Sequence, residues 1–267
     1  MKSSSNLKIK NYDGFNWVGF YTLYKKEIKR FFNVSTQTLL APAITTVLFY
    51  IIFTIALGRN LVQINSVSFS EFLAPGLICM AALQNAFANT SSSLLISKVQ
   101  GNIVDILMPP MSEVELTLAF SLGGITRGIV VGFVVALTIY TFVPIGIYSF
   151  FHIIYFALSS TMFLSLLGIF CGVWSQKFDH MAGITNFVIT PLTFLSGTFY
   201  SINSLPELWQ KIALFNPIFY MIDGLRYGFL GINDGNIYTG MLMLAIFNLI
   251  AISICMLVFK KGYRLRS

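Results

Sequence analysis

The chain has 267 residues, of which 56% are hydrophobic and only 10% are charged. The mean hydropathy is +0.76, and the apolar stretches are long enough to cross a ~30 Å hydrocarbon core, which excludes an ordinary soluble domain. The net charge of +7 does not indicate a nucleic-acid-binding surface, because the basic residues gather at the ends of the apolar stretches. The sequence therefore predicts an all-α membrane protein.

The first 37 residues form the longest polar stretch, and we expect a cytoplasmic N-terminus over 1–37. Within it, residues 15–33 interleave aromatic and aliphatic side chains with the charged residues Lys25, Lys26, Glu27, Lys29 and Arg30. This pattern favours an amphipathic helix lying in the membrane interface, with its basic side toward the cytosol. The alternative is a solvated arm that precedes the first span.

Six apolar stretches follow and predict a transmembrane domain over residues 38–259. We place the spans at 39–58, 72–96, 115–142, 146–173, 182–198 and 239–259. A basic tail, 260–267, follows the last span. Three cysteines lie within spans without CxxC spacing, so we interpret them as core residues; they are Cys79, Cys171 and Cys255.

The Lys and Arg residues are distributed unequally between the two sides that six spans define. The richer side holds thirteen of the seventeen, namely Lys2, Lys8, Lys10, Lys25, Lys26, Lys29, Arg30, Lys98, Lys177, Lys260, Lys261, Arg264 and Arg266. The other side holds Arg59, Lys211 and Arg226, and Arg127 falls within the third span. Because positive charges favour the cytoplasmic side, we expect both termini in the cytoplasm of a bacterial inner membrane.

The loop after the second span reads KVQGNIVDILMPPMS from Lys98 to Ser112. Its pattern predicts a short amphipathic helix that Pro109 and Pro110 stop. Ser112, with Glu115 three residues on, predicts a cap for the next helix. We interpret the short helix as a contact surface for a partner protein. The loop from Trp174 to Met181 is a possible second contact with that partner.

The stretch 199–238 is the longest connection between spans. It contains an apolar run that Pro206, Pro217 and Gly224 should break into short helical pieces. Irregular backbone at membrane depth is tolerated only where protein or a water-filled cavity covers it. We therefore expect a re-entrant helical hairpin that enters from the outer face, between spans five and six.

The chain offers little chemistry of its own. No Asp or Glu lies in the middle of a span, whereas ion-driven carriers usually use intramembrane carboxylates or broken helices to bind the coupling ion. There is no GxxxxGK[ST] phosphate loop and no nucleophile–base set. We expect a transport subunit rather than an enzyme, without metal or cofactor, energised by another chain. The alternative is an ATP-independent secondary carrier or channel.

Arg127 lies about a dozen residues into the third span. A guanidinium there is costly unless it faces protein or water, so it either pairs with Glu113 or Glu115 or faces the substrate. Glycines spaced four apart accompany it and let two helices approach closely, within one chain or between subunits. They are Gly124, Gly128 and Gly132.

Polar side chains recur at helical spacing on three spans, which places each set on one face of its helix. They are Thr46, Tyr50 and Thr54, then Gln84, Asn85, Asn89 and Ser92, and finally Asn186, Thr190 and Thr193. A neutral lining would suit an amphiphilic or sugar-bearing cargo, while ordinary interhelical hydrogen bonds would give the same pattern. The candidates for a pathway or dimer seam are Tyr50, Gln84, Asn85, Asn89, Arg127, Asn186, Thr190 and Thr193.

Five motifs together resemble permeases of the ABC-2 type, the membrane subunits of ATP-binding-cassette exporters. The motifs are FLAPGL (72–77), LQNAFANTSSSLL (83–95), KVQGNIVDILMPPMS (98–112), PLTFLSGTFYSINSLP (191–206) and NPIFYMIDGLRYGFLG (216–231). The similarity is greatest to the branch that includes nodulation-factor (lipo-oligosaccharide) export permeases.

The resemblance implies a membrane unit of two chains, with two copies of a separate ATPase that binds ATP and Mg. It implies an interface helix at 15–33, a coupling helix at 98–110 and outer re-entrant helices at 200–230. The second and fifth spans would line the pathway and the dimer seam. The ATPase contact would fall on Lys98, Gln100, Gly101, Asn102 and Asp105. The cargo could be a lipid, glycolipid, oligosaccharide or drug, and the partner chain could be identical or paralogous.

Overall fold

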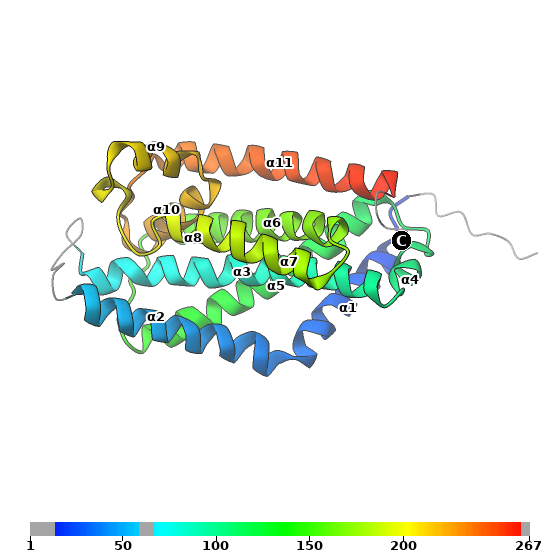
Figure 1. Cartoon of the computed structure of the whole chain (residues 1–267), viewed down its shortest axis with the longest axis horizontal. Coiled ribbons are helices and arrows are strands. Elements are labelled where there is room, and N and C mark those ends of the chain that lie inside the picture. Colours follow the sequence, from blue (N-terminus) through cyan, green and yellow to red (C-terminus); the bar gives the residue numbers. More distant parts are fainter. Residues whose placement is uncertain (1–13, 59–66, 263–267) are drawn as a thin grey trace, which may run out of the picture.

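The computed structural model describes residues 14–58 and 67–262, and its elements are helices. Five helical segments are long and apolar enough to cross a membrane. They run lengthwise through the molecule (Figure 1) and correspond to α2 (Ala41–Gly58) with the π-helical turn η1 (Thr36–Leu40) before it, α3 (Phe69–Val99), α5 (Glu113–Tyr140), α6 (Phe150–Trp174) and α11 (Ile237–Lys261).

α3 is the central helix, since it packs against α2, α5, α6 and α10 (Pro217–Leu230). Buried residues make up 72% of its most apolar window, against 28% for α11, which identifies α3 as core and α11 as peripheral. The helix begins at a capping box, in which the Ser68 backbone amide donates to Glu71 Oε2 at 3.0 Å and the Glu71 amide donates to Ser68 Oγ at 3.3 Å.

Glycines allow α3, α5 and α6 to approach closely. A Cβ at Gly128 would lie 2.8 Å from the Ala82 carbonyl oxygen, and one at Gly168 would lie 2.5 Å from the Phe87 carbonyl oxygen. The glycine ladder of α5 therefore faces α3 and α6 of the same chain. Of the two interpretations that the sequence left open, packing within the chain is the one that the structure shows.

The second, third, fourth and sixth predicted spans each correspond to one uninterrupted helix. The fifth, 182–198, does not. It is a run of α7 (Phe178–Ile184), the π-helical turn η2 (Thr185–Ile189) and α8 (Thr190–Leu195). The π-helical turns η1 and η2 both lie just before a proline, Pro42 and Pro191. Proline removes one backbone donor from the regular hydrogen-bond ladder, and the helix widens locally.

The predicted loop from Trp174 to Met181 is wrong beyond Lys177, because α7 already begins at Phe178. Asp179 in the first turn of α7 stabilises this start through the helix dipole. The connection between α6 and α7 is therefore limited to residues 175–177.

The stretch 199–238 is broken into short helices as predicted: the 3-10 turn η3 (Ile202–Ser204), α9 (Glu207–Phe215) and α10. Pro206 precedes α9, and Pro217 occupies the first turn of α10, where the missing N–H is no loss. The predicted break at Gly224 is wrong, because α10 continues through it. The Phe156 ring of α6 lies 2.2 Å from where a Cβ at Gly224 would be, so the glycine serves close packing.

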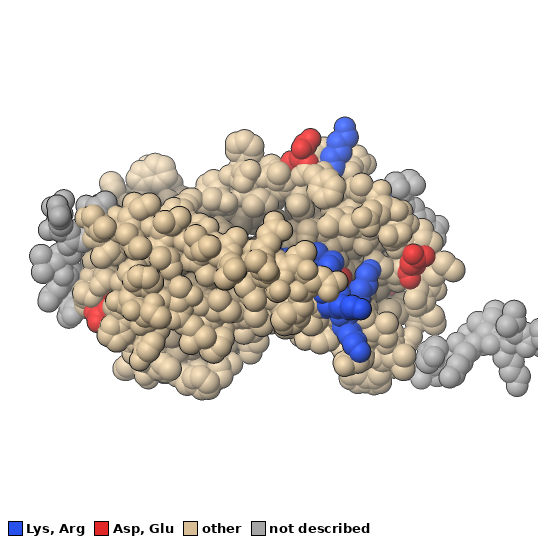
Figure 2. Space-filling view, turned by 90° about the horizontal axis from the view of Figure 1, so that it is seen from below, with Lys and Arg blue, Asp and Glu red and all other residues tan. Residues whose placement is uncertain are grey.

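The remaining elements gather at two ends of the bundle (Figure 1). α1 (Trp17–Asn33), α4 (Ile103–Leu107) and the last turn of α11 define the α1–α4 end, and the α9–α10 pair defines the α9–α10 end. On the face in Figure 2, Lys and Arg side chains gather toward the α1–α4 end, beside a broad uncharged surface. Outside the described residues lie Lys2, Lys8, Lys10, Arg59, Arg264 and Arg266.

Candidate functional site

α1 packs along α5 and forms the amphipathic helix that the sequence predicts. Asn16 caps it, with Asn16 Oδ1 accepting from the Gly19 amide at 2.9 Å, and the Asn16 amide donates to Glu115 Oε1 at 2.6 Å. The buried face consists of Leu23, Glu27 and Phe31. The exposed face carries Lys25, Lys26 and Lys29. The position of α1 in a membrane interface stays a prediction.

Where α1 meets α3, charged and polar side chains form the ion-pair cluster: Glu27, Arg30, Asn89, Ser92 and Ser93. Glu27 is fully buried, and its carboxylate accepts from Ser93 Oγ at 2.7 Å and from Arg30 Nη2 at 3.1 Å. Arg30 also donates to Asn89 Oδ1 at 2.9 Å and to Ser92 Oγ at 3.2 Å. A buried carboxylate is tolerated when it is paired and hydrogen-bonded, so the cluster fixes α1 on α3.

Arg127 lies beside this cluster and donates from Nη2 to Asn85 Oδ1 at 3.1 Å. The predicted pairing with Glu113 or Glu115 is wrong: among the described residues, the ion pair within 4.0 Å joins Arg30 to Glu27. Twelve or more helical residues at ~1.5 Å each separate Arg127 from either carboxylate. Glu115 instead closes the cap of α5, where the Ser112 amide donates to it at 2.8 Å.

The predicted coupling segment contains the expected helix, α4. Ile103 and Ile106 are buried against the bundle, while Val104, Asp105 and Met108 are exposed. Gln100, Gly101 and Asn102 are also exposed, and Gly101 has a φ of 76°, which glycine adopts without strain. The segment therefore presents both polar and apolar side chains outward.

Lys98 has a different orientation from its neighbours in this segment. Its Nζ donates to the carbonyl oxygens of Val173 at 2.5 Å and Ser175 at 2.6 Å, at the C-terminal end of α6. Cations stabilise a helix C-terminus by bonding to its last carbonyls. Lys98 thus ties the ends of α3 and α6 together, and its predicted contact with an ATPase is untested.

A groove of about 500 Å³ separates α1 from α4. Lys26 of α1 lines it on one side, and Asn102 and Asp105 line it on the other. Ile106, Pro109 and Met111 supply an apolar floor. The structure thus brings residues of the predicted interface helix and coupling segment onto one surface at the α1–α4 end.

The other pathway candidates lie apart from the ion-pair cluster and form no hydrogen bond to it among the described residues. Tyr50 is buried with its ring centroid 6.0 Å from that of Phe142. Gln84 lines a small space between α2 and α3. Asn186 is exposed, Thr190 is half-buried and Thr193 is buried, donating to the Ile189 carbonyl oxygen at 2.7 Å. Their role in a pathway or seam stays a prediction.

A second polar site at the α9–α10 end, here called the turn network, consists of Gly197, Ser201, Asp223, Arg226 and Asp234. Buried Arg226 donates to the Gly197 carbonyl oxygen at 2.7 Å and stacks 3.8 Å from the centroid of the Phe72 ring. The carboxylate of Asp223 accepts from the Asp234 and Gly235 amides at 2.8 and 3.0 Å.

Sequence reasoning missed the turn network. The Asp234–Gly235 pair is a turn signal, and Asp223 lies three residues before Arg226 on a helix, so both clues were present. Neither clue identifies the hydrogen-bond partners of these residues, because the partners lie in loops far apart in the sequence. Asp234, for example, accepts from Ser201 Oγ at 2.8 Å and from the Ile202 amide at 3.0 Å.

Among residues 14–58 and 67–262, no group of three His, Cys, Asp or Glu side chains could hold a metal ion. What the structure provides is a bundle of apolar helices, a groove of mixed polar and apolar lining at one end, and an ion pair behind it whose carboxylate is buried. This combination defines an all-helical membrane protein.

The chain belongs to the ABC-2 type transporter family, whose model matches residues 18–230. It is 38% identical over 251 residues to the inner membrane transport permease YadH of Escherichia coli (strain K12), across 94% of this chain and 98% of that protein. It is 24% identical over 224 residues to nodulation protein J of Rhizobium leguminosarum bv. viciae, across 82% and 83% of the two chains. The family resemblance of the motifs is thus confirmed.

Proposed function

We propose that the chain is the membrane-spanning permease subunit of an ATP-driven exporter, acting as a dimer with two copies of a separate ATPase that binds ATP and Mg. Its membrane is the bacterial inner membrane, with both termini and the α1–α4 end in the cytoplasm. Family membership and the name of the Escherichia coli relative support this. The positive charges at the α1–α4 end support the orientation.

The groove between α1 and α4 is the observation that carries the proposal. Lys26 faces this groove, while Glu27, the next residue, is buried in the ion-pair cluster. A partner that presses on α4 and α1 therefore acts on α3 through a short series of side-chain contacts. Coupling of this kind requires a structural element with two conformations, and the partner must bind one conformation more tightly than the other.

Unmade hydrogen bonds support a second arrangement of this region. Four buried side-chain nitrogens of the described residues have no hydrogen-bond partner, and three of them gather here: Arg30 Nε, Asn89 Nδ2 and Arg127 Nε. The fourth is Arg226 Nε in the turn network. An unsatisfied buried donor costs about 1–3 kcal/mol. A second arrangement that satisfies these donors and leaves others unpaired would therefore differ little in free energy from the arrangement in the structure. We infer that the cluster exchanges partners when the dimer switches between inward and outward access.

The remaining features complete the permease. α7, η2 and α8 together are the fifth of six spans, and α9 with α10 is the re-entrant hairpin that closes the outer side. The dimer seam lies on exposed apolar residues, among them Leu40, Ile44 and Leu48 before and within α2 and Phe187 in η2. The cargo is an amphiphile, such as a lipid, glycolipid, oligosaccharide or drug.

The test is reconstitution of the purified chain with its ATPase, followed by ATP hydrolysis across a panel of lipids and glycolipids. Replacing Asn102 and Asp105 by Ala should abolish stimulation while the dimer still assembles, because both side chains are exposed on the groove. The matched control replaces Glu207 and Lys211, exposed on α9, and should retain stimulation. Full stimulation of the groove variant would refute the coupling assignment, and transport without any ATPase would refute the exporter.

A further inference from the structure

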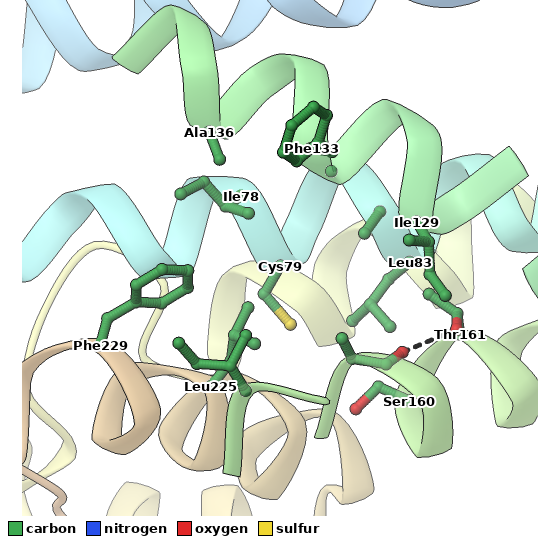
Figure 3. A pocket seen from close by; sticks show the side chains of 14 residues that line it. Ile78, Cys79, Leu83, Ile129, Phe133, Ala136, Ser160, Thr161, Leu225 and Phe229 are labelled. Carbon is green, nitrogen blue, oxygen red and sulfur yellow. Dashed lines mark hydrogen bonds between the residues drawn. The ribbon is translucent and has the colours of Figure 1, made fainter. Parts of the chain in front are cut away.

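A cavity of about 170 Å³ lies between α3, α5, α6 and α10, away from the groove and the ion-pair cluster (Figure 3). Its walls are almost entirely apolar, with Leu83, Phe133, Leu225 and Phe229 among them, and no charged side chain lines it. Phe133 is 63% exposed, so the cavity reaches the surface of a membrane-crossing helix. In the proposed permease α5 crosses the membrane, so this opening faces the bilayer.

One polar group in the cavity is unpaired. Ser160 is 1% exposed, and its Oγ has no hydrogen-bond partner within the part of the chain that the structure describes. The adjacent Thr161 satisfies its hydroxyl by donating to the Ala157 carbonyl oxygen at 2.6 Å (Figure 3). Serine in a helix usually makes that same bond to its own backbone, so the free Ser160 hydroxyl is the exception.

Size and polarity together restrict what could pair with Ser160. An apolar cavity of ~150 Å³ stays dry and accepts a guest of the size of benzene. A water molecule also needs two to four polar partners, and this cavity offers one unpaired hydroxyl. The partner must therefore arrive on a molecule that is itself mostly hydrocarbon.

We propose that this cavity binds a small neutral amphiphile, an aromatic ring or short alkyl body that carries a single hydrogen-bond acceptor such as a ketone. The guest enters from the bilayer beside Phe133, its body fills the space between α3 and α6, and its acceptor receives the hydroxyl proton of Ser160. The site does not depend on the ATPase or on the cargo of the exporter.

The test compares acetophenone with ethylbenzene, two probes of similar shape of which only the first has a carbonyl. Their binding to the purified chain in phosphatidylcholine nanodiscs is measured by equilibrium dialysis, corrected with protein-free nanodiscs. We expect acetophenone to bind about tenfold more tightly than ethylbenzene. This ratio of affinities corresponds to the net free energy of one buried hydrogen bond. The variant Ser160→Ala should bring the ratio close to one.

Two further variants distinguish the contribution of the Ser160 hydroxyl to binding from the contribution of the cavity volume. Ala157→Phe, or Ala136→Leu where the first variant does not fold, fills the space and should abolish binding of both probes. Ser253→Ala removes an exposed hydroxyl of α11 and should change neither. Equal binding of the two probes to the unmodified chain would overturn the proposal and assign the cavity to plain hydrocarbon such as an acyl chain. Binding no greater than to protein-free nanodiscs would overturn it as well.

Discussion

The ion-pair cluster and the turn network each hold an arginine near acidic side chains, but they use it differently. Arg30 in the first is half-buried, and Arg226 in the second is buried. In the ion-pair cluster, Arg30 donates mainly to side chains, those of Glu27, Asn89 and Ser92 on two helices, and also to the Asn89 backbone carbonyl oxygen at 2.7 Å. In the turn network, Arg226 donates to the Gly197 backbone and stacks on an aromatic ring. The acids of the turn network likewise accept from backbone amides.

The difference indicates which end of the bundle is built to move. Side chains that bond to side chains can exchange partners when one helix shifts along another, at little cost to either backbone. Bonds to backbone groups fix the path of the loops themselves, as where Asp234 holds the residues before α9 and Asp223 holds the residues before α11. We therefore expect changes in the turn network to reduce stability most, and changes in the ion-pair cluster to reduce coupling most.

Arg226→Met should have the largest effect on stability. The change keeps an apolar stem but removes the charged hydrogen bond to the Gly197 carbonyl oxygen, worth about 1.5–3 kcal/mol, and the desolvated stacking on Phe72, worth about 2 kcal/mol. A thiol-reactive dye measures this directly on heating in detergent, because Cys79, Cys171 and Cys255 are all buried and become reactive on unfolding.

The control for that measurement is Lys211→Met, which alters an exposed cation of α9 and should change stability by no more than ~0.5 kcal/mol. If Arg226→Met unfolded at the same temperature as the unmodified chain, the turn network would not be the rigid end of the molecule.

Glu27→Ala should have the next largest effect, a loss of about 2–3 kcal/mol, because it leaves Arg30 without its counter-ion and Ser93 Oγ without its acceptor. Adding Arg30→Ala should restore part of this loss, since the cation no longer needs a partner. A double-mutant cycle on the same melting assay should give a coupling energy of ~1–2 kcal/mol. Additive losses would mean that the two charges do not act as a pair.

Local patterns predicted the elements well. The capping box of Ser112 and Glu115, the short amphipathic α4 and the amphipathic α1 all depend on residues within one or two turns of each other, and the structure contains all three. Four of the six predicted spans are single helices for the same reason. Hydrophobic periodicity is a local property, and a sequence displays it directly.

Partners were harder to predict than elements. The sequence offers Arg127 two interpretations, a pair with a carboxylate on its own helix or a substrate-facing position. In the structure it bonds to Asn85, 42 residues earlier. The pattern of residues 15–33 predicts Glu27 and Arg30 as charges of an amphipathic interface helix but does not indicate that both side chains point inward toward α3. Periodicity indicates that a helix has two faces, but the choice of neighbour depends on how helices pack, which the glycine contacts of α5 decide.

Gly128→Ala tests that packing and should cost about 1–2 kcal/mol. The added methyl would lie 2.8 Å from the Ala82 carbonyl oxygen, which is backbone and cannot move aside without shifting α3. The matched change is Gly183→Ala in α7, where the structure leaves the space open and a stabilisation of ~0.5–1 kcal/mol is expected from helix propensity. Equal effects of the two changes in the melting assay would show that α5 does not set the position of α3.

Asn85→Ala should have the smallest effect, at most ~1 kcal/mol, and it defines the edge of the ion-pair cluster. Arg127 is only half-buried and makes one side-chain hydrogen bond, so its guanidinium is free to reorient when Asn85 is removed. Glu27 has no such route, because it is fully buried. A melting shift as large as that of Glu27→Ala would place Arg127 and Asn85 inside the cluster, and the unit that moves would then extend from α1 through α3 to α5.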